Sequence, residues 1–194
     1  EIGVEIADLN LGTFDQIGEF TAKKARSADS KEYKTAGCFF RPNYERGILI
    51  YSLIKKYNLK SFLEIGFGRG YATLCAAMAM HEAFGPGEGR IVTIDPGLDE
   101  KFINFLSEKY PAEWFKTIEF KKGFSNAVVP SLDEKFDFIY IDGDHMYESV
   151  KYDWENTKDK YNKILLFDDY HLPTNTDSGP VQCTLVIDQI DDKS

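Results

Sequence analysis

The sequence predicts a doubly wound α/β fold, in which a mostly parallel sheet carries helices on both faces. From residue 61 to residue 169, five short apolar runs alternate with amphipathic stretches. Parallel neighbouring strands need a crossover of a dozen or more residues, and helices usually supply it. The 194 residues, 43% of them apolar, suffice for one sizeable core and are too few for two ordinary domains.

The chain is expected to begin with a helical segment, residues 1–60, on the substrate side of an α/β unit formed by residues 61–194. The start signal Arg41-Pro42-Asn43 precedes apolar residues at helical spacing, namely Ile48, Leu49, Leu53 and Ile54. This pattern predicts a helix that leads into the first strand, and both segments form one globular unit.

The remaining elements follow from the alternation of apolar runs with amphipathic stretches. The five expected strands are 61–66, 90–95, 117–123, 136–142 and 163–169. The expected helices between them are 71–80, 98–110, 124–132 and 147–161. Two prolines and a glycine in 171–180 predict a loop over the strand ends, and 181–190 favours a helix slightly.

A glycine-rich turn joins the first expected strand to the next helix. Gly66, Gly68 and Gly70 permit a tight turn, close approach of backbone N–H groups to a ligand, and anion binding at the helix N-terminus. The alternative is that the glycines serve only to connect the strand to the helix and bind no ligand. Glu64, on the strand, would repel a pyrophosphate and attract an α-ammonium group. The turn therefore suits an amino-acid-bearing nucleoside better than NAD.

The run from Glu64 to Gly70 matches in full the pattern E-x-G-x-G-x-G of the class I S-adenosylmethionine-dependent methyltransferases. The sequence resembles this family over roughly residues 43–190, which implies a Rossmann-like fold and S-adenosylmethionine as cofactor. In the family, an acid after the second strand holds the ribose, and small residues after the third strand lie against adenine. The cofactor-binding positions thus implied are Glu64, Gly66, Phe67, Gly68, Asp95, Phe124, Ser125 and Asp142.

Two of these positions also have plain structural interpretations. Asp95 is suited to cap the following helix, and Phe124 is suited to the core. Both alternatives stay open at the level of sequence.

Acidic residues close two neighbouring strands of the expected sheet. Asp142 ends one strand, with Asp144 just beyond it, and Asp168 and Asp169 end the next. Neighbouring strands lie about 4.8 Å apart, so carboxylates at matching ends can converge on one ion. Hard oxygen ligands suit Mg²⁺, Mn²⁺ or Ca²⁺ better than zinc. The alternative is that Asp142 and Asp168 cap helices.

The pattern IDGDHMYESV followed by LLFDDY looks like the metal-dependent small-molecule O-methyltransferases, the catechol type and its relatives that act on sugars and antibiotics. The resemblance implies a divalent cation, with magnesium favoured, on Asp142, Asp168 and Asp169, and Asp144 is the reserve ligand. It also implies that His145 is the general base, at the position of the lysine in the catechol type.

Histidine replaces that lysine in the sugar-methylating relatives, and a neutral imidazole can accept a proton at neutral pH. A lone histidine is more often structural than catalytic, but its position three residues after Asp142 favours catalysis. His171 and His81 are the other histidines, and of these His171 is the better placed to contact substrate.

Composition restricts the partners. A net charge of −9 and a pI near 4.9 oppose nucleic-acid binding. No apolar run approaches the ~20 residues of a membrane span, and no signal core follows a basic start. Cysteines at 38, 75 and 183 have neither disulfide-like nor metal-ligand spacing, which predicts a reduced, cytoplasmic protein. A small-molecule acceptor is the expected partner, and the sequence leaves homo-oligomerisation open.

The leading hypothesis is an enzyme that methylates a hydroxyl of a small polar metabolite or sugar. The alternatives are a non-catalytic cofactor-binding or scaffold protein of the same fold, and an NAD-dependent oxidoreductase. Glu64 and the GxGxG spacing argue against the oxidoreductase. The family's sheet usually finishes with a helix and an antiparallel strand pair, whereas this chain ends soon after Pro180. We therefore expect either that the chain is truncated or that its last elements are missing or replaced, which keeps the scaffold alternative.

Overall fold

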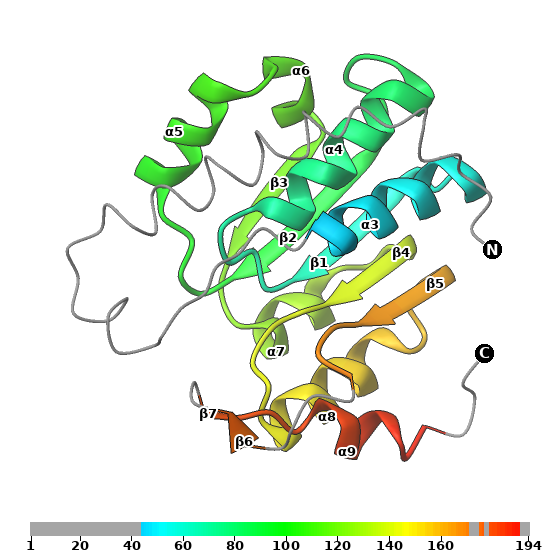
Figure 1. The fold of residues 1–194 in the computed structure, drawn as a ribbon, viewed down its shortest axis with the longest axis vertical. Coiled ribbons are helices and arrows are strands. Elements are labelled where there is room, and N and C mark those ends of the chain that lie inside the picture. Colours follow the sequence, from blue (N-terminus) through cyan, green and yellow to red (C-terminus); the bar gives the residue numbers. More distant parts are fainter. Residues whose placement is uncertain (1–43, 171–174, 177–178, 191–194) are drawn as a thin grey trace.

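The computed structural model describes residues 44–170, 175–176 and 179–190 of the chain. Its centre is a five-stranded parallel sheet with the strand order β3-β2-β1-β4-β5 (Figure 1). The strands are β1 (Ser61–Ile65), β2 (Arg90–Asp95), β3 (Ile118–Lys122), β4 (Phe136–Ile141) and β5 (Tyr161–Phe167). The order reverses between β1 and β4, so the prediction of a doubly wound sheet is confirmed.

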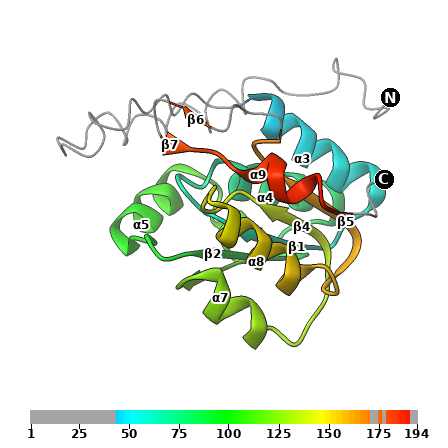
Figure 2. The same ribbon diagram turned by 90° about the horizontal axis from the view of Figure 1, so that it is seen from below.

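Helices cover both faces of this sheet, with α3 and α4 on one side and α7 and α8 on the other (Figure 2). The helices are α3 (Tyr44–Tyr57), α4 (Tyr71–Phe84), α5 (Glu100–Lys109), α6 (Ala112–Phe115), α7 (Ser125–Val128), the 3₁₀ turn η2 (Val129–Ser131), α8 (Tyr147–Thr157) and α9 (Cys183–Ile187). Among these helices, none combines the length and apolar character that crossing a membrane requires.

Four strands of the central sheet, β1, β2, β4 and β5, contribute apolar side chains to both faces, which explains why these strands read as nearly continuous apolar runs. On β1, Phe62 packs into the cluster beneath α3 and α4, whereas Leu63 and Ile65 pack into the cluster on the opposite face. By this alternation Glu64 faces the same side as Phe62. A carboxylate therefore points into the layer between the sheet and α4.

Several details differ from the expected elements, among them the longer α4, which ends at Phe84, and the additional helix α6. The helix α8 ends at Thr157, and β5 begins at Tyr161, because the carbonyl of Lys160 already accepts a hydrogen bond from the β4 amide of Phe136 (2.8 Å). The expected loop 171–180 contains a short antiparallel pair, β6 (Asn175–Thr176) with β7 (Gly179–Pro180). The helix favoured for 181–190 is present as the shorter α9.

The register of the central strands brings their carboxyl ends to one edge. Ile65 of β1 pairs with Ile141 of β4, which pairs with Phe167 of β5. The next residues continue the pattern, since the amide of Asp142 donates to the carbonyl of Ile65 (2.8 Å) and that of Asp168 to the carbonyl of Ile141 (2.9 Å). The acids predicted to lie at matching strand ends therefore do so.

Candidate functional site

A cavity of about 840 Å³ opens at this carboxyl edge of the sheet. In open α/β sheets, ligands bind at this edge, where the strand order reverses. The residues predicted from the sequence to hold the cofactor all line the cavity, namely Glu64, Gly66, Phe67, Gly68, Asp95, Phe124, Ser125 and Asp142. His145 and Asp169 line it as well, whereas Asp168 is not among its lining residues.

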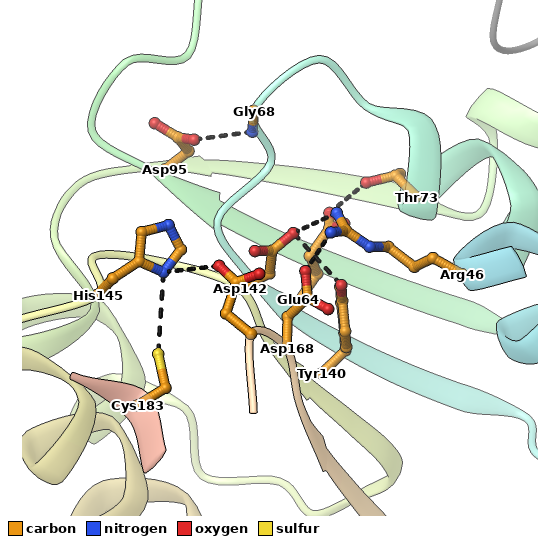
Figure 3. A network of polar contacts seen from close by, with 11 residues as sticks. Arg46, Glu64, Gly68, Thr73, Asp95, Tyr140, Asp142, His145, Asp168 and Cys183 are labelled. Carbon is orange, nitrogen blue, oxygen red and sulfur yellow. Dashed lines mark hydrogen bonds and ion pairs between the residues drawn. The ribbon is translucent and has the colours of Figure 1, made fainter. Parts of the chain in front are cut away.

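The first glycine of the turn is required by the close approach of two chain segments. Gly66 has a φ of 97°, and a Cβ built on it would lie 1.9 Å from the carbonyl oxygen of Asp142. A side chain would therefore separate the turn from the end of β4. Beyond it, the amide of Gly68 donates to Oδ2 of Asp95 (3.0 Å), which ties the turn to the end of β2 (Figure 3).

Asp95 is held by backbone amides on both of its oxygens. Oδ2 accepts from Gly68, and Oδ1 accepts from the amide of Gly97 at 2.6 Å. The following helix, α5, is capped by Asp99, whose side chain accepts from the amide of Lys101 (3.0 Å). The interpretation of Asp95 as a helix cap is therefore wrong. Each carboxylate oxygen keeps lone pairs for a further donor, such as a ribose hydroxyl.

Glu64 is a buried carboxylate on the floor of the cavity, with a side chain only 1% exposed. It accepts hydrogen bonds from the hydroxyls of Thr73 on α4 and Thr93 on β2, the latter at 2.5 Å. Burial raises the pKa of Glu64 to about 7, although the two hydroxyls and the nearby Arg46 act in the opposite direction. A cationic group of a ligand would favour the ionised form.

The two aromatic residues of the predicted site differ in their surroundings. The ring of Phe67 is 5% exposed and meets Phe120 edge-on at 5.5 Å, so it belongs largely to the core. Phe124 is 68% exposed and precedes Ser125, the first residue of α7. The core interpretation of Phe124 is therefore wrong, and its ring is free to lie against a ligand in the cavity.

An arginine from the N-terminal helix contacts two of the predicted metal ligands. Nη1 of Arg46 donates to Oδ2 of Asp142 (2.7 Å), and its Nη2 forms an ion pair with Asp168 (Figure 3). The hydroxyl of Tyr140 also reaches Oδ2 of Asp142 (3.3 Å). Burial raises the pKa of Asp142, and Arg46 opposes the rise. No motif or spacing in the sequence indicated this contact.

Asp169 faces the other side of the cluster. Its φ of 57° lies in the left-handed region, which aspartate tolerates better than most residues. Its Oδ2 lies 3.1 Å from Nδ1 of His145, and the Sγ of Cys183 lies 3.9 Å from the same nitrogen. Burial raises the pKa of Asp169, with Asp168 acting in the same direction.

One group of candidate metal ligands emerges among the described residues. Ligand atoms of Asp142, His145 and Asp169 all lie within 4.8 Å of one another. The sequence-based set was Asp142, Asp168 and Asp169. The structure brings two of these together with His145, and it pairs the third, Asp168, with Arg46.

The reserve residues do not join this cluster. Asp144 is exposed and accepts from the hydroxyl of Ser149 in α8 (2.7 Å). The cap position of α8 is Met146, so Asp142 does not cap that helix. His81 lies in α4 and does not line the cavity. His171 lies outside the described residues.

A model of a family described as a methyltransferase domain matches residues 63–170 of the chain. Caffeoyl-CoA O-methyltransferase 2 of Petunia hybrida is 33% identical over 107 residues, which are 52% of this chain and 41% of that enzyme. The chain thus spans about two fifths of the length of the curated relatives it matches.

Solved structures share the fold at lower identity. The O-methyltransferase TomG from Streptomyces achromogenes, in complex with S-adenosylmethionine, has a TM-score of 0.62 and 17% identity, covering 93% of this chain and 78% of that one. An O-methyltransferase from Bacillus cereus, in complex with S-adenosylhomocysteine, has a TM-score of 0.56 and 19% identity, covering 81% and 64%.

Proposed function

Because the chain belongs to the family of methyltransferase domains, we propose that it transfers a methyl group from S-adenosylmethionine to a hydroxyl oxygen of a small polar molecule, such as a sugar. One observation carries the proposal: a single cavity joins the glycine turn and Asp95 to the cluster of Asp142, His145 and Asp169. The names of the relatives, several of them O-methyltransferases, support an oxygen as the methyl acceptor.

S-adenosylmethionine supplies an electrophilic methyl group on a sulfonium centre. The chain's contribution is to hold it. Asp95 is suited to accept from the ribose hydroxyls, Gly66 and Gly68 let the backbone approach, and the ionised Glu64 favours an α-ammonium group nearby. Phe124 and Ser125 would flank the adenine ring. These contacts fix the methyl carbon relative to the acceptor, and positioning of this kind supplies much of the rate in group transfer.

The acidic cluster fits a divalent cation. The carboxylates of Asp142 and Asp169 are hard oxygen donors of the kind that suit Mg²⁺ or Mn²⁺, and their ligand atoms lie within 4.8 Å of each other and of the imidazole of His145. When bound, such an ion would draw the acceptor hydroxyl into place and lower its pKa. Asp168 forms an ion pair with the guanidinium of Arg46. An ion bound by Asp142, Asp168 and Asp169 together would therefore require that ion pair to break.

His145 is the group best suited to take the acceptor's proton. Its Nδ1 faces Asp169, and the other ring nitrogen points away from that carboxylate, toward the side of the site where Asp95 lies (Figure 3). A carboxylate on one ring nitrogen fixes the tautomer and leaves the other nitrogen as the acceptor. Asp169 is then a positioning residue for His145 as well as a candidate metal ligand.

The alternatives are weaker. Membership in a methyltransferase-domain family opposes the oxidoreductase, and Glu64 opposes a pyrophosphate at the turn. A scaffold protein would bind the cofactor without turnover. Incubating the full chain with methyl-labelled S-adenosylmethionine, Mg²⁺ and a panel of sugars and phenols distinguishes the two. Label transferred to a hydroxyl supports the enzyme, whereas cofactor binding without transfer to any acceptor supports the scaffold.

Replacing Asp95 with alanine is expected to weaken cofactor binding by about 1–3 kcal/mol, because a pair of charge-assisted hydrogen bonds to the ribose is lost. Calorimetric titration with S-adenosylhomocysteine measures the change. Asp99→Ala is the matched control, since it removes a helix cap nearby and should lower the melting temperature without changing affinity. Equal affinity of wild type and Asp95→Ala would exclude Asp95 from the site.

Cofactor affinity is expected to rise from about pH 6 to about pH 7.5, because Glu64 must lose its proton to favour an ammonium group. The pKa of Glu64 in the free protein is about 7, so binding in this range should release protons. Titrations in two buffers of different ionisation enthalpy count them. Glu64→Gln should bind more weakly and release fewer protons, and identical proton release in both proteins would contradict the assignment.

Replacing Arg46 with glutamine is expected to tighten Mn²⁺ binding by about 10-fold, because a competing cation leaves Asp142 and Asp168. Titration calorimetry or the electron paramagnetic resonance of free Mn²⁺ provides the measurement. Arg69→Gln is the control. Arg69 lines the same cavity, but burial rather than a carboxylate of the ion site shifts its pKa. Weaker Mn²⁺ binding in Arg46→Gln would show that the guanidinium organises the ion site rather than blocking it.

A further inference from the structure

The helix α9 is anchored close to the loop after β4, which carries His145. It lies beside α8 (Figure 1). A buried apolar cluster joins the two helices, formed by Val150, Val181, Cys183, Val186 and Ile187. Phe167, at the end of β5, packs against this cluster. None of the roles above uses the cluster, which holds the start of α9 beside two of the strand ends that supply the site.

Gln182, which directly precedes α9, holds the chain on both sides of Met146. Its backbone amide donates to the carbonyl oxygen of His145 (2.8 Å), and its side-chain Oε1 accepts from the backbone amide of Tyr147 (2.8 Å). The two hydrogen bonds fix residues 145 and 147 relative to one residue of another segment. The backbone of His145 is therefore tied to α9 as well as to β4.

The side-chain bond of Gln182 takes the place of a local cap on α8. The first amides of a helix have no partner within the helix, and a serine, threonine, asparagine or aspartate at the N-cap position usually supplies one. Here the N-cap residue is Met146, and its side chain makes no cap hydrogen bond. A short polar residue at that position would serve the helix without linking it to another segment. The acceptor on Gln182 instead couples the start of α8 to α9.

The ring of His145 depends on its backbone for its position. Its side chain is 38% exposed, so packing restrains the ring only in part. Oδ2 of Asp169 lies 3.1 Å from Nδ1, and the Sγ of Cys183, the residue after Gln182, lies 3.9 Å from it. Residues 182 and 183 thus contact the backbone and the ring of the same histidine. A reacting group that is displaced by about 1 Å can lose about 100-fold in rate.

Resting on the proposed function, we infer that Gln182 is a positioning residue for the general base His145. It holds the backbone so that Nδ1 faces Asp169 and the other ring nitrogen is left for the acceptor's proton. Gln182 is not among the residues that line the cavity, so it acts through His145. The competing interpretation is that the cap only stabilises α8. The two interpretations differ in what happens to His145 when the side-chain bond is lost.

Replacing Gln182 with leucine removes the acceptor and keeps a side chain of similar size. With an acceptor identified by the label-transfer screen, kcat should fall about 10–100-fold, whereas KM and the affinity for S-adenosylhomocysteine should change little. Gln182→Glu retains an oxygen acceptor of the same length and should keep most of the wild-type rate. Gln189→Leu is the matched control, because Oε1 of Gln189 accepts from the hydroxyl of Tyr147 (3.0 Å) and not from its backbone amide.

Two readouts distinguish positioning from stabilisation. In a His145→Gln background, Gln182→Leu should lower kcat no further, because the group that it positions is already gone. Nitrogen NMR of the ligand-free chain, labelled at histidine and assigned with His145→Gln, shows which ring nitrogen carries the proton in the neutral ring. Wild type and Gln189→Leu should show one tautomer of His145, protonated at Nδ1, and Gln182→Leu should show a mixture of both.

The outcomes separate this inference from the proposed function. A wild type that methylates no acceptor contradicts the proposed function, and the NMR comparison then decides the role of Gln182. An unchanged kcat and tautomer in Gln182→Leu, an equal fall of kcat in the His145→Gln background, or a rate that Gln182→Glu does not restore would each overturn the inference. Circular dichroism and thermal melting accompany each variant. Loss of the fold in both Gln182 variants would assign the residue to structure and overturn the inference as well.

Discussion

Replacing His145 with glutamine is expected to lower kcat by roughly 10²–10⁴-fold, the usual contribution of a positioned acid or base. Glutamine keeps a polar side chain of similar reach but cannot take a proton from the acceptor hydroxyl. The fold, cofactor affinity and melting temperature should change little, since the His145 ring is partly exposed and its side-chain partners are Asp169 and Cys183. Steady-state kinetics with an identified acceptor measure the effect.

Two further measurements test whether His145 is a base or a metal ligand. The pH profile of kcat/KM should have an acidic limb in wild type that the variant lacks, because only the wild type carries a general base at this position. Mn²⁺ affinity should be similar in both proteins, and a large loss in the variant would make His145 a ligand. His81→Gln is the matched histidine control, because His81 does not line the cavity. Full activity of His145→Gln would remove it from the mechanism.

Exhaustive chelation with EDTA is expected to abolish turnover and leave cofactor binding largely intact. The candidate ligands converge in one cluster, whereas the proposed contacts of Asp95 and the glycine turn with the cofactor's ribose and amino-acid parts need no ion. Added Mg²⁺ or Mn²⁺ should restore the rate. Activity that persists after chelation would leave Arg46 as the cation that neutralises Asp142 and Asp168.

Asp169→Asn and Asp144→Asn form a matched pair for the same question. Each removes one negative charge from a loop at the edge of the sheet. Asp169 belongs to the candidate ligand group, whereas Asp144 is exposed and bonded to Ser149. Only Asp169→Asn should raise the Mg²⁺ concentration needed for half-maximal activity. An equal effect of the two variants would indicate that general charge, rather than coordination, sets the metal requirement.

The strand ends were predictable because hydrophobic periodicity alone fixes them. Once five apolar runs form a parallel sheet, the residues after each run must meet at one edge, so Asp95, Asp142 and Asp168 had to lie there. The glycine turn was predictable for a similar reason, since the backbone approach at Gly66 excludes any side chain.

The contacts that complete the site were not predictable from local patterns. Arg46 and Asp142 are in contact although 96 positions separate them in the sequence, and Cys183 and His145 are in contact although 38 positions separate them. No spacing rule links such positions. The burial of Asp153, which lines the cavity and is 3% exposed, was not predictable for another reason, because a carboxylate on an amphipathic helix is normally solvated. The ring of Phe67, inside a motif that binds through its backbone, turned out to pack in the core.

The buried carboxylate of Glu64, which accepts from Thr73 and Thr93, also affects the free energy of unfolding. The pKa of Glu64 is about 7 in the folded chain, against an ordinary value of 4.5, so the protonated form favours the folded state. That stabilisation is complete below pH 4.5 and is lost as the pH rises through 7, a difference on the order of 3 kcal/mol. Near pH 7 the ligand-free protein therefore bears this buried charge in part of its molecules, and a cationic ligand would compensate it. Binding of the ligand would then raise the free energy of unfolding in addition to supplying the methyl group.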